Sequence, residues 1–349
     1  MKKIIINGRF LTHRITGVER FAREILNELD TMVKPGRLEL AVPKNVKKIP
    51  TYKNIQINRV GILKNKMWEH ISFPYYVFKK KGISLNLCNV APLVSPGIVC
   101  IHDVKVKARP HDFSKQFLLW YRLLLKNETK RARKILTVSK FSKKELGKYY
   151  KVNANRIEVI YNGWQHYAEV PYDNMALKKY SLEKFNYYFS MCSLEPNKNF
   201  KWVAEEAKRN PDQIFAVAGS INKKVFSKNF DFECPSNMKL LGYVSDEEAK
   251  TLMKECKAFL FPTFYEGFGI PPLEAIAAGC KNVVVSDTEV MHELFDNSVS
   301  FIKPKNYNYN LNNLVSYKKD PSTVLNLYSW HNSARKLLNM LIREKYYEN

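Results

Sequence analysis

The sequence predicts an α/β protein built from two doubly wound, Rossmann-like domains. Short β-branched and apolar runs alternate with amphipathic helical patterns along the chain, which is typical of parallel sheets with crossover helices. A chain of 349 residues is long for one core and suits two domains of about 150 to 180 residues each. Each half of the chain also contains a full series of alternating strands and helices, which indicates two separate sheets.

Each half of the chain carries its own series of predicted strands. In the first half they are expected at residues 3–7, 38–42, 54–58, 84–88, 98–102, 134–138 and 157–161. In the second half they are expected at 187–191, 214–219, 238–242, 258–262, 282–286 and 300–302. We therefore assign residues 1–163 to an N-terminal domain and residues 181–329 to a C-terminal domain, joined by a stretch without a clear period.

Three helix positions are marked by local signals. Ser142 followed by Glu145, and Ser245 followed by Glu248, have the spacing of a capping box, which predicts a helix start at each serine. Residues 330–349 have an amphipathic pattern and predict one helix. We expect this last helix to pack back on the N-terminal domain.

The composition argues against several classes of protein. The six cysteines are widely spread and form no Cys-x-x-Cys pair, which disfavours a zinc site, an iron–sulfur cluster or a disulfide scaffold. They are expected to be reduced thiols of a cytoplasmic protein. The apolar run at the N-terminus is too short for a signal peptide and predicts a strand. The uncharged run 83–101 contains proline and asparagine, which suits two strands around a loop better than a membrane span.

Positive charge is concentrated in the first half of the chain. Residues 1–163 hold 34 lysine and arginine residues and 11 aspartate and glutamate residues, a net charge of +23. Residues 164–349 hold 23 and 22 respectively, a net charge of +1. This asymmetry indicates an anionic partner for the N-terminal half, such as membrane phospholipid, a lipid-diphosphate acceptor or nucleic acid. The alternative is a lysine-rich solvated surface.

Two segments of this half combine aromatic and basic residues. Residues 64–82 place five aromatic residues beside three consecutive lysines, and residues 115–134 form a similar helical pattern. Each segment fits an interfacial membrane contact, with aromatic rings at headgroup depth and lysines on anionic lipid. Each equally fits a core-facing stripe with a basic cap. The sequence leaves both interpretations open.

The strongest chemical signal lies at residues 261–280, FPTFYEGFGIPPLEAIAAGC. A strand ends, a glycine-bracketed turn follows, and Pro271 and Pro272 suit the first positions of a helix. The free backbone N–H groups and the dipole of such a helix start favour a diphosphate. Glu266 in the turn and Glu274 in the helix can then reach a sugar and a ribose.

The same segment suggests chemistry without a metal. A diphosphate leaving group gains negative charge as its bond to the sugar breaks, so fixed N–H donors stabilise the transition state more than the ground state. The sequence also contains no Asp-x-Asp motif, and Asp231-Phe232-Glu233 is the nearest approach to one. We therefore expect neither a metal nor another cofactor.

The segment YEGFGIPPLEA contains two glutamates, Glu266 and Glu274, with seven residues between them. This arrangement resembles glycosyltransferase family 4, whose members are retaining enzymes of the GT-B fold. The likeness extends over most of the chain. It includes NGRFLTHRITGVERFAREIL at 7–26, IHDV at 101–104, ILTVSKFSKKEL at 135–146, VIYNG at 159–163, SLEPNKNF at 193–200 and LGYVSDEEAKTLM at 241–253. The resemblance implies an N-terminal acceptor domain and a C-terminal nucleotide-sugar domain that face a central cleft.

The resemblance assigns roles to individual residues of the donor domain. Glu266 matches the first motif glutamate, near the donor sugar, and Glu274 matches the second, which hydrogen-bonds the ribose. The backbone N–H groups of Gly267, Phe268 and Gly269 would hold sugar hydroxyls or phosphate.

Three further residues match family positions around the diphosphate and the sugar. Lys198 matches the phosphate-binding lysine. Gly17 matches the glycine that lets the N-terminal domain approach the diphosphate closely, because a side chain there would intrude. His102 matches the histidine that faces the sugar across the cleft, so Glu266 and His102 are the predicted catalytic residues.

One departure from the family pattern concerns the phosphate site. The family usually places an arginine beside its lysine, at the position of Ser193 or Asn197, and neither residue is basic. Lys198 therefore either holds the diphosphate alone or is assisted by an arginine of the N-terminal domain. The candidates for that assistance are Arg9, Arg14 and Arg20.

The resulting functional expectation is a retaining, metal-independent hexosyltransferase. GDP-mannose is the favoured donor, with UDP- or dTDP-sugars as alternatives, and the acceptor is a lipid-linked or surface-polysaccharide saccharide at the cytoplasmic face of the membrane. Front-face transfer is favoured over double displacement, because no carboxylate is securely placed as the nucleophile. The alternatives are an epimerase or phosphorylase of the same fold, and a non-catalytic protein that binds a membrane or another polyanion. No nucleic-acid module is recognisable.

Overall fold

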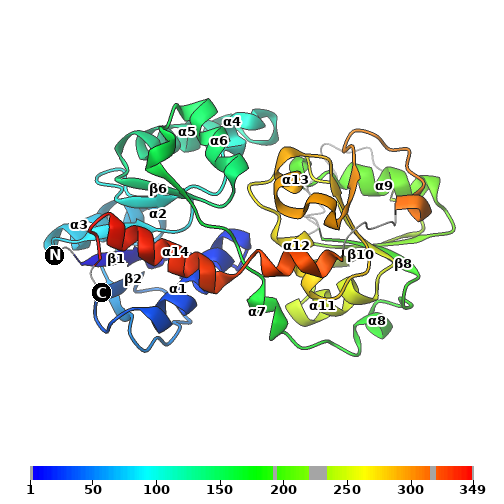
Figure 1. The fold of residues 1–349 in the computed structure, drawn as a ribbon, viewed down its shortest axis with the longest axis horizontal. Helices are drawn as coiled ribbons and strands as arrows, with labels where there is room; N and C mark the ends of the chain where they lie inside the picture. Colours follow the sequence, from blue (N-terminus) through cyan, green and yellow to red (C-terminus); the bar gives the residue numbers. More distant parts are fainter. Residues whose placement is uncertain (1–2, 192–194, 220–233, 315–319, 348–349) are drawn as a thin grey trace. The chain divides into compact units, whose positions relative to one another are not determined.

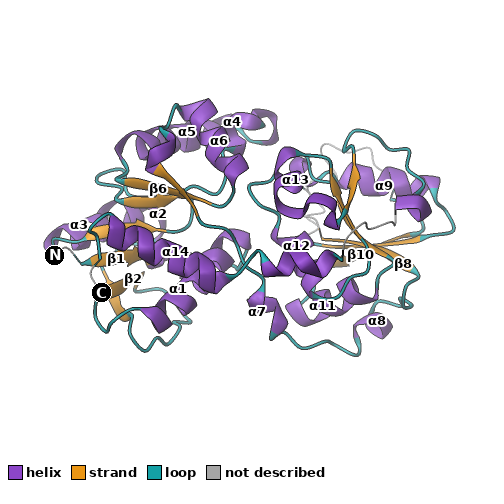
Figure 2. Ribbon diagram, in the orientation of Figure 1, coloured by secondary structure: helices purple, strands orange, loops and turns teal. Residues whose placement is uncertain are grey.

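A computed structural model describes residues 3–191, 195–219, 234–314 and 320–347 of the chain. The chain divides into two compact units: unit 1 comprises Met1–Gly163 and Tyr328–Asn349, and unit 2 comprises Trp164–Leu327. Each unit contains one parallel β-sheet with helices packed around it (Figures 1 and 2). The predicted α/β fold with two Rossmann-like sheets is therefore confirmed.

The sheet of unit 1 has seven described strands in the order β3-β2-β1-β4-β5-β6-β7. Every pair is parallel, and Ile4 of the first strand pairs with Leu38 on one side and Ile83 on the other. The strands are β1 Ile4–Asn7, β2 Leu38–Pro43, β3 Gln56–Val60, β4 Ile83–Asn86, β5 Ile98–Cys100, β6 Lys134–Thr137 and β7 Ile157–Val159.

The sheet of unit 2 has six described strands in the order β10-β9-β8-β11-β12-β13, and its pairs are also parallel. The strands are β8 Tyr187–Met191, β9 Ile214–Ala218, β10 Met238–Gly242, β11 Ala258–Phe261, β12 Val283–Ser286 and β13 Ser300–Ile302. All thirteen described strands overlap the ranges predicted from sequence. Helices cover both faces of such sheets, so most strands are fully buried and appear in the sequence as continuous apolar runs.

The strand order reverses direction once in each sheet. In unit 1 the reversal lies between β1 and β4, and in unit 2 it lies between β8 and β11. At such a switch point the loops from neighbouring strands leave to opposite faces, which opens a crevice at the carboxyl ends. Ligands of open α/β sheets bind in this crevice, so the two switch points are where candidate site residues should be sought.

The helices that connect the strands differ widely in length. In unit 1 they are α1 Gly17–Met32, α2 Asn65–Met67, α3 Phe73–Lys79, α4 Lys105–Ala108, α5 Lys115–Arg131, α6 Lys140–Tyr150 and α14 Trp330–Arg343. In unit 2 they are α7 Gln165–Ala168, α8 Ala176–Lys179, α9 Phe200–Arg209, α11 Asp246–Glu255, α12 Ile270–Ala277 and α13 Glu289–Phe295. The short turns η1 Gly8–Thr12, η2 Trp68–Ser72 and η5 Pro196–Lys198 also matter for the site.

One of the two predicted capping boxes is correct. At the start of α11 the Ser245 hydroxyl accepts a hydrogen bond from the Glu248 backbone N–H, and the Ser245 backbone N–H donates to the Glu248 carboxylate. The other prediction is wrong, because α6 begins at Lys140 and its N-cap is Ser139, which accepts a hydrogen bond from the Ser142 backbone N–H. Two serines three positions apart offer the same capping chemistry, and the earlier one lies two residues after the end of β6.

The C-terminal helix packs within unit 1. Helix α14 starts at Trp330, as predicted, but ends at Arg343 rather than continuing to residue 349. It lies against α1 (Figure 1), and the Ser333 hydroxyl donates to the Tyr161 carbonyl at 2.7 Å. The buried Trp330 ring also contacts Phe21 of α1 edge to face. The last helix therefore contributes to the core of the N-terminal sheet layer.

The described cysteines are free thiols, as expected. Cys100, Cys256 and Cys280 are buried, Cys88 is half-buried and Cys234 is exposed, while Cys192 lies outside the described residues. The uncharged run 83–101 forms β4, a loop and β5. No described helix has both the length and the apolar character needed to cross a bilayer.

Candidate active site

The motif at residues 261–280 forms the strand, turn and helix that the sequence predicts. Strand β11 ends at Phe261, and Gly269 is the N-cap of α12, whose first turn contains Pro271 and Pro272. Gly269 has φ +116° and ψ +61°, and a Cβ atom there would lie 2.8 Å from Met291 Cε. The glycine is therefore required by the turn, which brings Glu266 and the start of α12 to the carboxyl edge of the sheet.

Lys198 and Glu266 meet at this edge. Lys198 Nζ lies 2.9 Å from Glu266 Oε1, and the two side chains are 24% and 16% exposed. The lysine ends the short turn η5 after β8, whereas the glutamate follows β11. Because β8 and β11 flank the switch point of the unit 2 sheet, the pair lies in the crevice where this fold binds ligands.

Two buried asparagines join the loops that carry this pair. Asn197 Nδ2 donates to the Tyr265 carbonyl at 2.7 Å. Asn199 Nδ2 donates to the carbonyls of Pro262 and Pro304, each at 2.8 Å. In the sequence, Asn197 stands out only as a position where the family has arginine. Its side chain instead connects the Lys198 turn to the Glu266 loop.

Glu274 has a partner that the sequence did not indicate. His166 Nε2 lies 3.0 Å from Glu274 Oε1, and the two side chains are only 4% and 9% exposed. His166 belongs to the short helix α7, within the stretch assigned from sequence to the join between domains. No motif or period marks this histidine, and 108 positions separate it from Glu274. The contact fixes the orientation of the carboxylate.

The remaining predicted site residues lie in unit 1. Gly17 is the first residue of α1, which follows Thr16, the N-cap of a capping box with Glu19. His102 follows β5 and is buried, with its ring edge to face on Phe21 at 4.9 Å between centroids. The structure thus brings Lys198, Glu266 and the α12 turn together within unit 2.

His102 is held as a neutral ring. Burial lowers the pKa of His102 to about 4, although the hydrogen bond to Leu87 opposes this shift. His102 Nε2 lies 2.8 Å from the Leu87 carbonyl oxygen and donates its proton to it, since a carbonyl only accepts. The Nδ1 atom is then an acceptor in the neutral tautomer. At neutral pH this side chain can accept a hydrogen bond from a hydroxyl but carries no charge.

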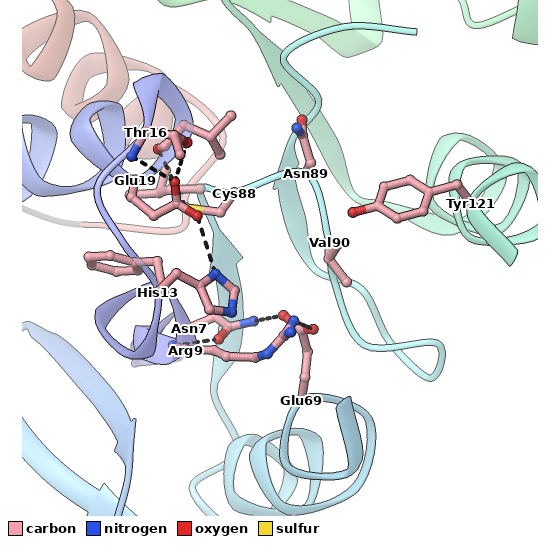
Figure 3. Close-up of a pocket in the computed structure, with 13 residues that line it drawn as sticks. Asn7, Arg9, His13, Thr16, Glu19, Glu69, Cys88, Asn89, Val90 and Tyr121 are labelled. Atoms are coloured by element: carbon pink, nitrogen blue, oxygen red, sulfur yellow. Dashed lines mark hydrogen bonds and ion pairs between the residues drawn. The ribbon is translucent and has the colours of Figure 1, made fainter. Parts of the chain in front are cut away.

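A polar pocket lies at the switch point of the unit 1 sheet. Its volume is about 240 Å³, and it is formed by the end of β1, the segment leading into α1, the turn η2 and the residues after β4. Figure 3 shows the labelled side chains of this pocket. They are Asn7, Arg9, His13, Thr16, Glu19, Glu69, Cys88, Asn89, Val90 and Tyr121.

Two acid–base pairs line this pocket. Arg9 forms an ion pair with Glu69, which also accepts a hydrogen bond from Asn7 at 3.0 Å. Burial raises the pKa of Glu69 above its usual value, although Arg9 opposes the shift. His13 Nδ1 lies 3.2 Å from Glu19 Oε1. The ion pair and the His13–Glu19 contact offer both donors and acceptors, which match the hydroxyl groups of a neutral sugar better than a free anion. We call this hollow the paired pocket.

The candidate replacements for the missing family arginine differ in their surroundings. Arg9 is paired with Glu69, Arg14 is exposed, and Arg20 is half-buried on α1. Ser193 and the segment Asp231–Glu233 lie outside the described residues. Within the described ranges, His, Cys, Asp and Glu side chains form no group of three that could hold a metal ion.

Two protein-family models match the chain. The model described as glycosyl transferases group 1 matches residues 175–326, and the model described as glycosyltransferase family 4 matches residues 84–165. The first match contains the Lys198–Glu266 pair and α12, and the second contains His102. Together they span about two thirds of the chain.

Curated relatives are similar over part of their length. The O-antigen chain mannosyltransferase RfbU of Salmonella typhimurium is 30% identical over 231 residues, which cover 65% of this chain and 62% of the relative. The O-antigen chain mannosyltransferase B of Escherichia coli is 27% identical over 201 residues, or 53% of each chain. This chain therefore spans less than two thirds of the length of either relative.

Solved structures show the same fold over the whole chain. Sucrose-phosphate synthase from Thermosynechococcus elongatus has a TM-score of 0.75 at 14% identity, covering 99% of both chains. Anabaena Alr3699/HepE in complex with UDP-glucose has a TM-score of 0.72 at 15% identity, covering 98% of this chain and 100% of that one. At this level of identity the likeness establishes the fold alone.

Proposed function

Because this chain belongs to the glycosyltransferases of the GT-B fold, with group 1 and family 4 domains, we propose that it moves a hexose from a nucleotide sugar to a saccharide acceptor. The two curated relatives named above are O-antigen chain mannosyltransferases, which supports mannose as the sugar and a bacterial surface polysaccharide as the product. GDP-mannose is the first donor to test. UDP-sugars come second, since the Anabaena neighbour is in complex with UDP-glucose.

The observation that carries this proposal is the Lys198–Glu266 pair at the switch point of the unit 2 sheet. A cation there can bind the donor diphosphate, and the start of α12 directs backbone N–H groups toward the same crevice. These donors are fixed before the reaction, so they stabilise the charge that develops on the leaving diphosphate. Such an arrangement needs no metal or other cofactor.

The other donor-site residues take the roles implied by the family. Glu274, oriented by His166, would accept hydrogen bonds from the ribose hydroxyls. The backbone N–H groups of Gly267 and Phe268 would contact sugar hydroxyls or phosphate.

We propose front-face transfer with retention of configuration. The departing diphosphate accepts the proton of the acceptor hydroxyl, the bond from the anomeric carbon to the diphosphate oxygen breaks, and the acceptor oxygen bonds the same carbon from the same side. Glu266 orients the sugar and stabilises the developing positive charge. It is not assigned as a nucleophile, because no carboxylate is securely placed beneath the anomeric carbon.

The acceptor side of the reaction is proposed for unit 1. Its paired pocket has a volume of about 240 Å³, below the roughly 300 to 1,000 Å³ of pockets for drug-sized ligands, which suits a single sugar ring. Gly17 and His102 belong to the same unit. The net charge of +23 on residues 1–163 supports a lipid-linked acceptor at the cytoplasmic face of a membrane.

Donor hydrolysis tests the proposal most directly. GDP-, UDP- and dTDP-sugars are incubated with the protein in the presence of EDTA, and release of nucleoside diphosphate is measured for wild type, Glu266→Ala and the control Glu183→Ala. Glu183 is an exposed acid of the same unit. Slow release of one nucleotide by wild type and the control only is the expected result.

The opposite result would favour the second candidate, a non-catalytic protein that binds a polyanion through its basic unit. No release and no binding of any nucleotide sugar would contradict the enzyme. Release that depends on a divalent ion would keep the transferase and contradict the metal-free mechanism.

A further inference from the structure

A second pocket of unit 1 lies between α4, α5 and α6, away from the paired pocket. Its volume is about 590 Å³. Among the described residues that line it, none is acidic and six are basic: Lys107, Arg122, Lys126, Lys130, Lys151 and Arg156. We call it the basic pocket. Six cations around one hollow repel each other unless an anion occupies it, so the lining favours an anionic ligand.

Two buried polar atoms of this pocket have no partner in the described structure. They are Arg122 Nε and the Tyr150 hydroxyl, and both residues line the hollow. Both atoms are shielded from solvent, so they are not open to a ligand in the hollow. Arg156 is already oriented, since its guanidinium donates to the carbonyls of Thr129 and Ala132 at 3.0 and 2.7 Å. The pocket therefore presents an oriented guanidinium and several lysines to a ligand with several oxygen atoms.

The rim of the basic pocket is apolar as well as basic. Leu119, Leu123, Lys126 and Lys130 follow one another on α5 at steps of four, three and four residues, which places them on one helix face. Leu119 is 65% exposed and Leu123 is 55% exposed. The opposite face of α5 packs Leu118, Tyr121 and Leu125 against the core. The solvent-facing side of α5 therefore carries two leucines beside two lysines, although an amphipathic helix normally has polar residues there.

A second exposed apolar group adjoins the same helix. Trp120 of α5 contacts the His70 ring of η2 and lies under Lys66 Nζ at 5.2 Å. On this neighbouring segment Met67 is 56% exposed and Ile71 is 50% exposed. The two basic and aromatic segments of the sequence therefore meet at Trp120. Exposed apolar side chains beside cations on both segments fit a membrane interface better than a solvated surface.

We propose that the basic pocket binds the phosphate headgroup of an anionic phospholipid, and that Leu119 and Leu123 enter the bilayer interface beside it. The inference deepens the membrane partner proposed above, because it assigns that partner to a defined surface. Headgroup phosphate neutralises the cations that line the pocket, and acyl chains cover the leucines. Nucleic acid would satisfy the cations but would leave the outward leucines uncovered.

Flotation with lipid vesicles tests this assignment. The full chain is mixed with vesicles of phosphatidylcholine alone or of equal parts phosphatidylcholine and phosphatidylglycerol. Binding to the anionic vesicles only is expected. Lys126→Glu/Lys130→Glu should weaken it by about tenfold or more, because each lysine near an anionic surface contributes favourably. Leu119→Ser/Leu123→Ser should weaken binding without changing the charge.

A matched control separates the pocket from general charge. Lys47→Glu/Lys48→Glu changes two exposed lysines of the loop between β2 and β3 and gives the same net charge as the α5 pair. Its affinity for anionic vesicles should lie within about threefold of the wild-type affinity when both are measured at the same salt concentration. Equal loss in both double variants, or equal binding to neutral vesicles, would overturn the proposal. The proposal would also be overturned if the wild-type protein bound single-stranded RNA but no vesicles, and if the α5 double variant lost that RNA binding.

Donor hydrolysis without vesicles separates this inference from the proposed function. Lys126 and Lys130 have no assigned role in sugar transfer, so the α5 variant should release nucleotide at the wild-type rate and should show a wild-type unfolding temperature. Vesicle binding by a wild-type protein that hydrolyses no donor would contradict the transferase and support the lipid site. Donor hydrolysis by a wild-type protein that does not bind anionic vesicles would support the transferase and contradict the lipid site.

Discussion

Lys198 Nζ lies 2.9 Å from Glu266 Oε1, so a lysine and a glutamate 68 positions apart in the sequence form one ion pair at the carboxyl edge of the unit 2 sheet. Both side chains remain partly exposed, and a ligand can therefore reach them. A donor diphosphate would compete with Glu266 for the lysine. The released carboxylate would then be available to the hydroxyls of the donor sugar, which couples diphosphate binding to sugar orientation.

Removing the Lys198 charge should weaken donor binding. We expect Lys198→Met to raise the dissociation constant of the preferred nucleotide sugar by about 10- to 100-fold, since hydrogen bonds to charged groups contribute about 1.5 to 3 kcal/mol. Isothermal titration calorimetry measures the change. Lys208→Met, at an exposed lysine of α9, is the control and should bind as wild type. Unchanged affinity in Lys198→Met would assign the diphosphate to another cation.

The His166–Glu274 contact predicts an effect on ribose recognition. In His166→Phe the carboxylate loses the partner that fixes its orientation, so a ribose hydroxyl should be bound less favourably. We expect the preference for a ribonucleotide sugar over its 2′-deoxy analogue to fall by about 5- to 20-fold, consistent with one weakened hydrogen bond. The ratio of the two kcat/KM values reports this change.

The ratio distinguishes orientation from general damage. A variant that merely loses stability would lower kcat/KM for both donors equally and leave the ratio unchanged. His166→Asn keeps a hydrogen-bond donor on a shorter side chain, so its ratio should lie between those of wild type and His166→Phe. An unchanged ratio in both variants would show that His166 does not act through Glu274.

The sequence predicts the sheets well because their burial is extreme. Strands such as β11 and β12 are buried on both faces, so their apolar runs stand out from the amphipathic helices between them. The glycine turn and the helix start at Pro271 are also local features, readable from residue type alone. The positions of Glu266 and Glu274 in this turn and helix follow directly from them.

Contacts between distant segments could not be predicted in this way. His166 lies in a stretch with no clear period, and its partner is specified only by the packing of α7 near α12. The basic pocket likewise depends on how α5 and α6 pack, because Arg122 and Tyr150 belong to different helices. Competition between equivalent local signals also limits prediction, as the choice of Ser139 over Ser142 as a cap shows.

Replacing Gly269 should lower the stability of the fold because of its backbone conformation, not because space is lacking for a side chain. Its φ of +116° is unfavourable for any residue with a side chain, whereas the nearest atom to an added Cβ is the flexible end of Met291. Gly269→Ala should lower the free energy of unfolding by about 1 to 3 kcal/mol. Urea denaturation measures the loss.

A double-mutant cycle identifies the cause of that loss. Met291→Leu shortens the neighbouring side chain with little change in volume, so it should not rescue Gly269→Ala if the backbone is responsible. The coupling between the two substitutions should then stay below about 0.5 kcal/mol. A larger favourable coupling would instead identify the contact with Met291 as the source of the cost.

His102 should remain neutral well below the pH at which an ordinary histidine is protonated. Its pKa in the folded protein is lowered by burial to about 4, against about 6.5 for an exposed histidine. Between these values the unfolded chain binds a proton that the folded chain does not, so the His102 contribution to stability is present above pH 6.5 and is lost as the pH falls toward 4. The slope should approach about 1.4 kcal/mol per pH unit. The NMR titration of the His102 ring should show no midpoint above pH 5, and the stability difference between wild type and His102→Asn should shrink over the same window. A ring that titrates near pH 6.5, with a stability difference independent of pH, would show that His102 reaches water and can carry charge during the reaction.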